Sequence, residues 1–112
     1  MELKSTREGT NLIVDVEGRV DGTNAMDFQS ALEDAIQQSD QGVIMDMGQL
    51  QYISSAGLRV ILLVAKSLQK QNAKLLGCAL SESVREIFAI SGFDKIVPVH
   101  ESRADALKAL ED

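Results

Sequence analysis

The chain has 112 residues, of which 45% are apolar and 25% charged, and its formal net charge is −6. These values predict one domain with a substantial hydrophobic core and exclude extended disorder. Because Lys and Arg are scattered along an acidic chain, binding to nucleic acid or to an anionic membrane surface is not expected. The acidity suits solubility, or a partner with a basic face.

The N-terminal half is predicted to hold three strands and one helix. Alternation of apolar and acidic residues over Leu12–Glu17 is typical of a half-buried strand with one solvated face. An amphipathic helix begins at about Asn24 and ends before Gly42. The continuous apolar run Val43–Met47 indicates a strand covered on both faces. In chain order we expect a strand over 2–7, a strand over 12–17, this helix, a strand over 43–47 and a loop over 48–54.

The C-terminal half alternates helices and strands. Gly92 ends one predicted helix, and Pro98 marks the last strand as an edge strand. The single cysteine, Cys78, lies in an apolar run typical of a buried strand. The expected elements are helix 55–71, strand 73–79, helix 81–91, strand 96–99 and helix 102–110. The full order β-β-α-β-α-β-α-β-α predicts an α/β fold whose mostly parallel sheet has about five strands and carries four helices.

The sequence holds no motif of a catalytic, metal or cofactor site. His100 is the only histidine, so neither a metal site nor a base for a serine nucleophile is expected. No glycine-rich phosphate-binding loop is present. The amino terminus lacks the apolar segment of a signal peptide, and the longest apolar run, Val60–Ala65, is too short to span a bilayer. We expect a cytoplasmic protein without cofactor or membrane insertion that is not an enzyme.

Two adjacent hydroxyls, Ser54 and Ser55, stand where a loop becomes a helix, just before Gly57. One reading is structural: a serine caps the first helical turn, and the glycine permits close packing. The other reading is that one hydroxyl accepts a phosphate, because a helix start offers free N–H groups and a favourable dipole. The residues alone leave both readings open.

Projection of this helix at about 100° per residue separates a core stripe from an exposed flank. The expected core stripe is Leu58, Ile61, Leu62, Ala65 and Leu68. The opposite flank carries Arg59, Leu63, Lys66 and Lys70, with Ser55 one turn before Arg59. Leu63 on a basic, exposed flank is either an ordinary surface leucine or a partner contact. Arg59 is either a solvated charge or a group that pairs with a phosphate on Ser55.

The segment Ile53–Leu58 resembles the signature of the STAS domain family, in its anti-sigma factor antagonist branch. The resemblance runs along the chain and implies a single STAS domain over 1–112: Gly18–Asp21 resembles the motif after the second strand, and Val43–Asp46 resembles the third strand with its terminal aspartate. Ser81–Arg85 is similar to the start of the third helix. Aligned on Gly57, Ser55 falls at the phosphorylated serine. Ser54, where the family often has Asp, is the competing acceptor.

The resemblance implies a partner switch. Unphosphorylated, the domain is expected to bind an anti-sigma factor that is also a GHKL-type serine kinase, which frees the sigma factor. Phosphorylation of Ser55 is expected to abolish this binding, and a PP2C-type phosphatase is expected to reverse it. Asp21 and Asp46 are expected near Ser55, at the carboxyl ends of neighbouring strands. The expected partner-binding residues are Asp21, Thr23, Asp46, Ser54, Ala56, Gly57, Arg59, Leu63 and Lys66.

Two other functions are compatible with the same family pattern. One is a partner switch that acts on secretion or on a signalling enzyme, through the same surface. The other is a STAS subunit of a lipid ABC transporter, which would not need the serine. We expect a monomer in each case.

Overall fold

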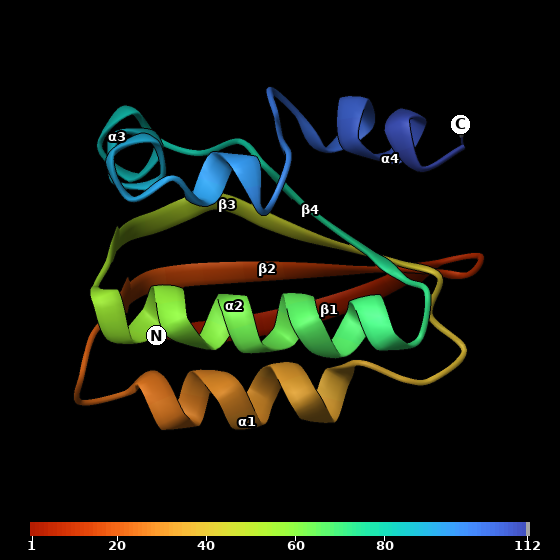
Figure 1. Cartoon of the computed structure of the whole chain (residues 1–112), viewed down its shortest axis with the longest axis horizontal. Coiled ribbons are helices and arrows are strands. Elements are labelled where there is room, and N and C mark those ends of the chain that lie inside the picture. Colours follow the sequence, from red (N-terminus) through yellow and green to blue (C-terminus); the bar gives the residue numbers. More distant parts are fainter. Residues whose placement is uncertain (112) are drawn as a thin grey trace.

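The computed structural model of the protein describes residues 1–111, and in this part of the chain five strands form one mixed sheet in the order β1-β2-β3-β4-β5 (Figure 1). β1 pairs antiparallel with β2, and every later neighbour pairs parallel. The strands are β1 (Glu2–Glu8), β2 (Asn11–Val20), β3 (Gly42–Ile53), β4 (Lys74–Cys78) and β5 (Val99–His100). The predicted α/β class and element order are confirmed.

The helices cover the two faces of the sheet unequally. α1 and α2 lie side by side on one face (Figure 1), and Val84 and Phe88 of α3 are buried in the same larger core. α4 covers the other face, where Ala106 packs on Ile13 and Ile44 in a smaller cluster. The helices are α1 (Ala25–Ala35), α2 (Ser55–Lys70), α3 (Glu82–Ser91) and α4 (Arg103–Glu111), with a 3₁₀ turn η1 (Phe93–Lys95) before β5. Gly92 adopts φ 78° after α3, which confirms it as the predicted helix end.

α4 overturns the expectation that Leu12–Glu17 has one solvated face. Ile13, which points away from α1 and α2, is 1% exposed because α4 lies over it. The run Val43–Met47 is covered on both faces as predicted: Val43 and Met45 belong to the larger core, and Ile44 to the core under α4. Cys78 is fully buried in the same smaller cluster, as its apolar neighbours indicated.

Three strand lengths differ from the sequence prediction. The strand expected over 12–17 runs over Asn11–Val20, because Gly18 to Val20, expected to be loop, pair with β3. The expected loop 48–54 is strand as far as Ile53, because β2 pairs with it up to Val20 opposite Ile53. The expected strand 96–99 is reduced to Val99–His100. Pro98 accounts for this shortening because it has no N–H to continue the ladder with β4.

The buried stripe of α2 is displaced from the predicted one. Leu58, Ile61 and Leu68 are buried as expected. Leu62 and Ala65 are only half-buried, and Val60 and Val64 are buried in their place. The displacement arises because α1 packs along one side of α2, while the other side faces the open edge of the short β5.

Candidate functional site

Ser54 is the N-cap residue of α2. Its Oγ accepts a hydrogen bond from the Gly57 N–H at 3.3 Å, and its backbone is extended, with φ −87° and ψ 174°. The backbone N–H of Ser54 donates to the Val20 carbonyl at 2.9 Å, and its carbonyl accepts from the Leu58 N–H at 2.9 Å. The half-buried Ser54 side chain therefore closes the first turn and ties the helix start to the end of β2.

Ser55 is the first residue of α2 and is exposed. It takes no part in the cap, so its hydroxyl is free to point into solvent. The first turn of α2 contains no acidic residue, and exposed Arg59 follows one turn later. Both features favour negative charge at this position, because the N-terminal end of a helix carries partial positive charge.

Gly57 sets how closely α2 approaches the sheet. A Cβ atom there would lie 2.6 Å from Ile53 Cγ1 and 2.8 Å from Val20 Cγ1, much closer than carbon atoms tolerate. Both neighbours are core side chains at the ends of β3 and β2. The glycine therefore lets the serine-bearing turn rest directly on the strand ends, as one reading of the sequence proposed. Half-buried Ala56 packs against the same core.

The β2–α1 turn lies at the same end of the sheet. Asp21 accepts hydrogen bonds from Thr23 through its N–H at 2.9 Å and its hydroxyl at 2.6 Å. These bonds lower the pKa of the Asp21 carboxyl below its ordinary value of 3.8. The Asp21 N–H donates to Asn24 Oδ1 at 2.9 Å, which braces the turn. Because Asp21 directly follows Val20, which bonds Ser54, the predicted proximity of Asp21 to the serines is confirmed.

Asp46 does not belong to this end of the sheet. It stands opposite Asp15 and Cys78 in the ladder, seven residues before β3 ends at Ile53. At 3.3 Å per residue, seven residues of extended strand separate it from the strand end by up to about 23 Å. Its Oδ2 accepts from Arg103 Nε at 3.0 Å, under α4. The expectation that Asp46 lies near Ser55 is wrong because β3 is longer than its apolar run, and its role in partner binding stays a prediction.

Arg103 and Asp46 belong to a half-buried polar arrangement that sequence reasoning missed. Arg103 Nη2 also lies 2.5 Å from Asp15 Oδ1, so two carboxylates of the sheet hold α4. Burial raises the pKa of the neighbouring Cys78 thiol to about 11, and the charge of Asp46 adds to this effect. The thiol is therefore un-ionised near neutral pH. The arrangement fastens a helix and offers no open chemistry.

A cation and an aromatic ring, also missed, meet at the end of the sheet that carries Ser55. Arg19 and Tyr52 are ladder partners, and the Arg19 guanidinium carbon lies 4.7 Å from the Tyr52 ring centroid. Tyr52 is 37% exposed, whereas its neighbour Ile53 is buried in the core with α2. Because side chains alternate along a strand, the pair lies on the face opposite α2. No local pattern would have paired two residues so far apart in the sequence.

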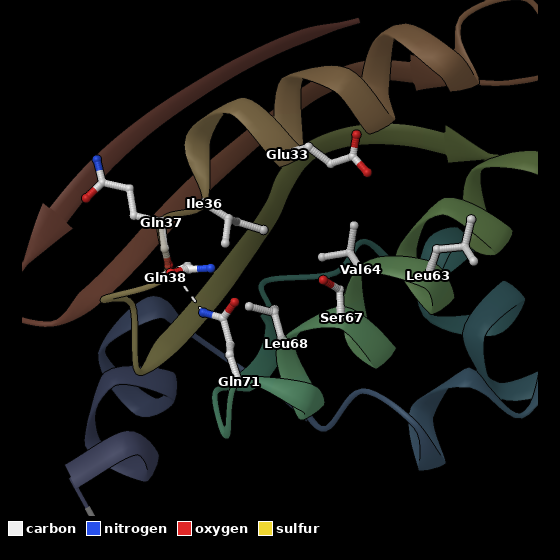
Figure 2. Close-up of a pocket in the computed structure, with 9 residues that line it drawn as sticks. All are labelled: Glu33, Ile36, Gln37, Gln38, Leu63, Val64, Ser67, Leu68 and Gln71. Atoms are coloured by element: carbon white, nitrogen blue, oxygen red, sulfur yellow. Dashed lines mark hydrogen bonds between the residues drawn. The ribbon is translucent and has the colours of Figure 1, made fainter.

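The exposed flank of α2 follows the serine end. Arg59, Leu63 and Lys66 are all exposed, with Leu63 at 44%, as the helix projection predicted. Leu63 also lines a cavity of about 200 Å³ between α1 and α2 (Figure 2). The Gln71 side chain closes one end of this cavity by donating to the Gln37 carbonyl at 3.2 Å. Lys66 lies toward the other side of α2, away from α1.

The structure thus brings together most of the predicted site. Asp21, Thr23 and the serine-bearing turn gather at one end of the sheet, and the flank of α2 continues from them. Within the described residues, no three His, Cys, Asp or Glu side chains are grouped as metal ligands would be. Over the same residues, none of the helices combines the length and apolarity that crossing a membrane requires.

The family model, the similar sequences and the similar solved structures all point to the STAS domain family. The family model of the STAS domain matches residues 3–106. BtrV of Bordetella bronchiseptica, described as a candidate anti-sigma factor antagonist, is 41% identical over 111 residues, covering 99% of this chain and 96% of that protein. The crystal structure of an anti-sigma factor antagonist from Mycobacterium paratuberculosis has a TM-score of 0.89 at 22% identity, over 99% of this chain and 94% of that one. The phosphorylated form of the Bacillus cell fate determinant SpoIIAA has a TM-score of 0.72 at 15% identity, over 97% of this chain and 99% of that one.

Proposed function

This chain belongs to the STAS domain family, and on that premise we propose that it is a cytoplasmic anti-sigma factor antagonist switched by phosphorylation of Ser55. Its unphosphorylated form binds an anti-sigma factor that is also a GHKL-type serine kinase, which releases the sigma factor. The phosphorylated form no longer binds, and a PP2C-type phosphatase restores it. The protein is a regulator and a substrate of enzymes.

The contrast between the two serines carries this proposal. The Ser54 hydroxyl accepts the Gly57 N–H and is half-buried, whereas Ser55 is exposed and outside the cap. A kinase can reach the exposed hydroxyl without disturbing the first turn of α2. A related fold has been solved in a phosphorylated form, SpoIIAA, which supports the view that this architecture tolerates the modification.

The chemistry at Ser55 is a simple phosphoryl transfer. The Ser55 Oγ attacks the γ-phosphorus of ATP, the bond from that phosphorus to the ADP oxygen breaks, and the hydroxyl proton leaves to a base of the kinase. The product carries about −1.5 to −2 additional charges at neutral pH. The α2 N-terminus and Arg59 stabilise this charge locally, so the fold is kept while the surface offered to the partner changes sign.

The partner surface extends from the β2–α1 turn along α2. Asp21 and Thr23 form its rigid border, and the turn at Ala56 and Gly57 is its centre. Arg59 and Leu63 continue it along the helix, with Lys66 at its far end. Such a mixture of one exposed apolar side chain with charges of both signs is typical of transient interfaces, which are only about as apolar as the rest of a protein surface.

Phosphorylation by the cognate kinase tests the site. Incubation of the full chain with the kinase and ATP should add one phosphate, measured by intact-mass spectrometry, and Ser55→Ala should remain unmodified. Ser54→Ala is the matched control and should still be phosphorylated. If Ser55→Ala accepts phosphate as fully as the parent protein, the assignment is wrong.

Binding measurements test the switch itself. Ser55→Asp should weaken binding to the kinase at least about tenfold, because a partner matched to a neutral hydroxyl meets a charge at the centre of the interface. Ser30→Asp makes the same change at an exposed position of α1 and should bind like the wild type. Equal affinity of Ser55→Asp and Ser30→Asp, measured by calorimetry, would contradict the proposal.

A further inference from the structure

A groove of about 470 Å³ runs along the outer edge of β4, on the side of α2 that faces away from α1. Half-buried Leu62 and Ala65 of α2 form one wall. Leu75 of β4 forms the floor, and Ile96 and Pro98 form the opposite wall. We call this surface the edge groove. Leu62 and Ala65, which were predicted as core residues, remain partly accessible because they line the edge groove.

The sheet edge beneath the groove is open for a specific reason. The Gly77 N–H donates to the Pro98 carbonyl at 2.9 Å, and the ladder between β4 and β5 starts at this pair. In a continued parallel ladder, the Leu75 carbonyl would accept the N–H of residue 98. Proline has no N–H, and Ile96 is already folded into the end of η1. The outward carbonyl of Leu75 is therefore left without a strand partner from β5.

The edge groove has a charge opposite to that of the whole molecule. The chain carries a net charge of −6, yet Lys66 and Lys74 line the groove and no Asp or Glu does. Across the described chain, no ion pair involves either lysine. An apolar floor between two free ammonium groups, beside an open carbonyl, suits an extended peptide with apolar and acidic side chains.

The edge groove is remote from Ser55. Lys66 is eleven residues further along α2, which corresponds to about 16 Å at 1.5 Å per residue. The Debye length at physiological ionic strength is about 8 Å, so charge on Ser55 is largely screened at this distance. Lys74 lies beyond the C-terminal end of the helix, further still from Ser55.

We propose that the edge groove is a second docking site, which binds a short extended segment of a partner protein that carries apolar and acidic side chains, and that it does so equally well whether or not Ser55 is charged. The apolar side chains contact Leu62 and Ala65, the acidic ones pair with Lys66 and Lys74, and a backbone N–H of the segment donates to the Leu75 carbonyl. The site meets the proposed anti-sigma factor surface only at Lys66 and includes neither serine.

Selection from a random heptapeptide library displayed on phage tests this proposal with the full chain as bait. Enriched peptides should combine apolar with acidic residues. When synthesised with a fluorescent label, they should bind the wild type and Ser55→Glu with the same affinity in anisotropy titrations. Lys74→Glu should weaken binding at least about fivefold through charge reversal. Lys70→Glu is the control, since it makes the same change on exposed α2 outside the groove.

Three outcomes overturn the proposal. The first is the absence of any peptide enriched above a selection on empty beads. The second is an enriched peptide that binds Lys74→Glu and Lys70→Glu equally well, which places it elsewhere. The third is loss of binding in Ser55→Glu, which assigns the peptide to the serine surface. Amide shifts of Leu75 and Gly77 on peptide addition, followed by NMR, should accompany the expected result. None of these measurements uses a kinase. They therefore test the edge groove separately from the proposed phosphorylation switch at Ser55.

Discussion

The sheet carries acidic side chains in two regions that behave in opposite ways. Under α4, Asp15 and Asp46 share Arg103, and a helix covers them. At the strand ends beside Ser55, Asp21 bonds only the turn that follows it, through Thr23, and none of the ion pairs in the described chain includes it. Aspartate on neighbouring strands of one sheet is therefore paired with a cation in the first region, and has no ion-pair partner among the described residues in the second.

The charges under α4 hold the fold together, whereas those beside Ser55 are available to a partner. In the region under α4 the charges satisfy one another, so what they contribute is attachment of the C-terminal helix. In the serine region the backbone is held by close packing at Gly57 and by the Ser54 cap, while the Ser55 hydroxyl and the charge of Arg59 remain exposed. A rigid base with exposed polar groups is suited to bind a partner without a large ordering cost.

Removing the close packing at Gly57 should have the largest effect. Gly57→Val places side-chain atoms where Ile53 and Val20 already lie, and should lower the free energy of unfolding by about 3 kcal/mol. Urea denaturation measures this loss. Gly22→Val is the control, because a Cβ at Gly22 meets nothing within 4 Å, and it should change stability little. Equal losses in both variants would show that the serine turn has no rigid base.

Removing Arg103, the cation that Asp15 and Asp46 share, should loosen α4 from the face of the sheet that it covers. Arg103→Leu leaves Asp46, whose side chain is 17% exposed, without its cation, and should cost about 2 kcal/mol in unfolding experiments. Because α4 then detaches more often, the buried Cys78 thiol should react faster with a disulfide reagent at pH 8.

Arg85→Leu is the control for this variant. Arg85 pairs with exposed Glu101 at 3.9 Å, and its loss should change stability by no more than about 0.5 kcal/mol. Cys78 should remain as unreactive as in the wild type, since its raised pKa of about 11 keeps it un-ionised. Unchanged labelling in Arg103→Leu would mean that the cation does not hold α4 in place.

The two serines should differ in stability as well as in phosphorylation. Ser54→Ala removes the cap of α2 and should cost about 1 kcal/mol. Ser55→Ala removes an exposed hydroxyl outside the cap and should leave the thermal midpoint close to that of the wild type. Differential scanning calorimetry compares the two variants directly, and a larger loss in Ser55→Ala would reverse their roles.

The smallest effect concerns the titration of Asp21. Its pKa is lowered below 3.8 by Thr23, so its ionised form stabilises the folded protein above that value, and this contribution is lost as the pH falls through the lowered pKa. An NMR titration of the carboxyl carbon should show this low pKa in the wild type. Thr23→Val removes the hydroxyl donor and should move the pKa upward, toward 3.8. An unchanged pKa in Thr23→Val would contradict the assigned cause.

The serine turn was accessible to sequence reasoning because it is a local feature. A cap, a glycine and the start of a helix lie within four residues, so spacing alone indicated a capped helix start, although it did not decide which serine is the cap. The order of elements and the burial of Cys78 were accessible for the same reason. The Arg103 cluster and the Arg19–Tyr52 pair were not, since each joins residues from different strands or helices whose meeting depends on ladder register.

The sequence by itself determined the element order, the capped helix that begins at Ser55, and the basic flank that follows it, because capping and helical periodicity act over a few residues. Only the tertiary structure decided that β3 runs on to Ile53, that Asp46 lies far from Ser55, and that one side of α2 borders an open groove. These features depend on which strand pairs with which, and how far. Pairing with β2 makes residues 48–53 part of β3, although they are not apolar enough to be recognised as a strand. Pro98 shortens β5, although the run 96–99 is apolar enough to be recognised as one.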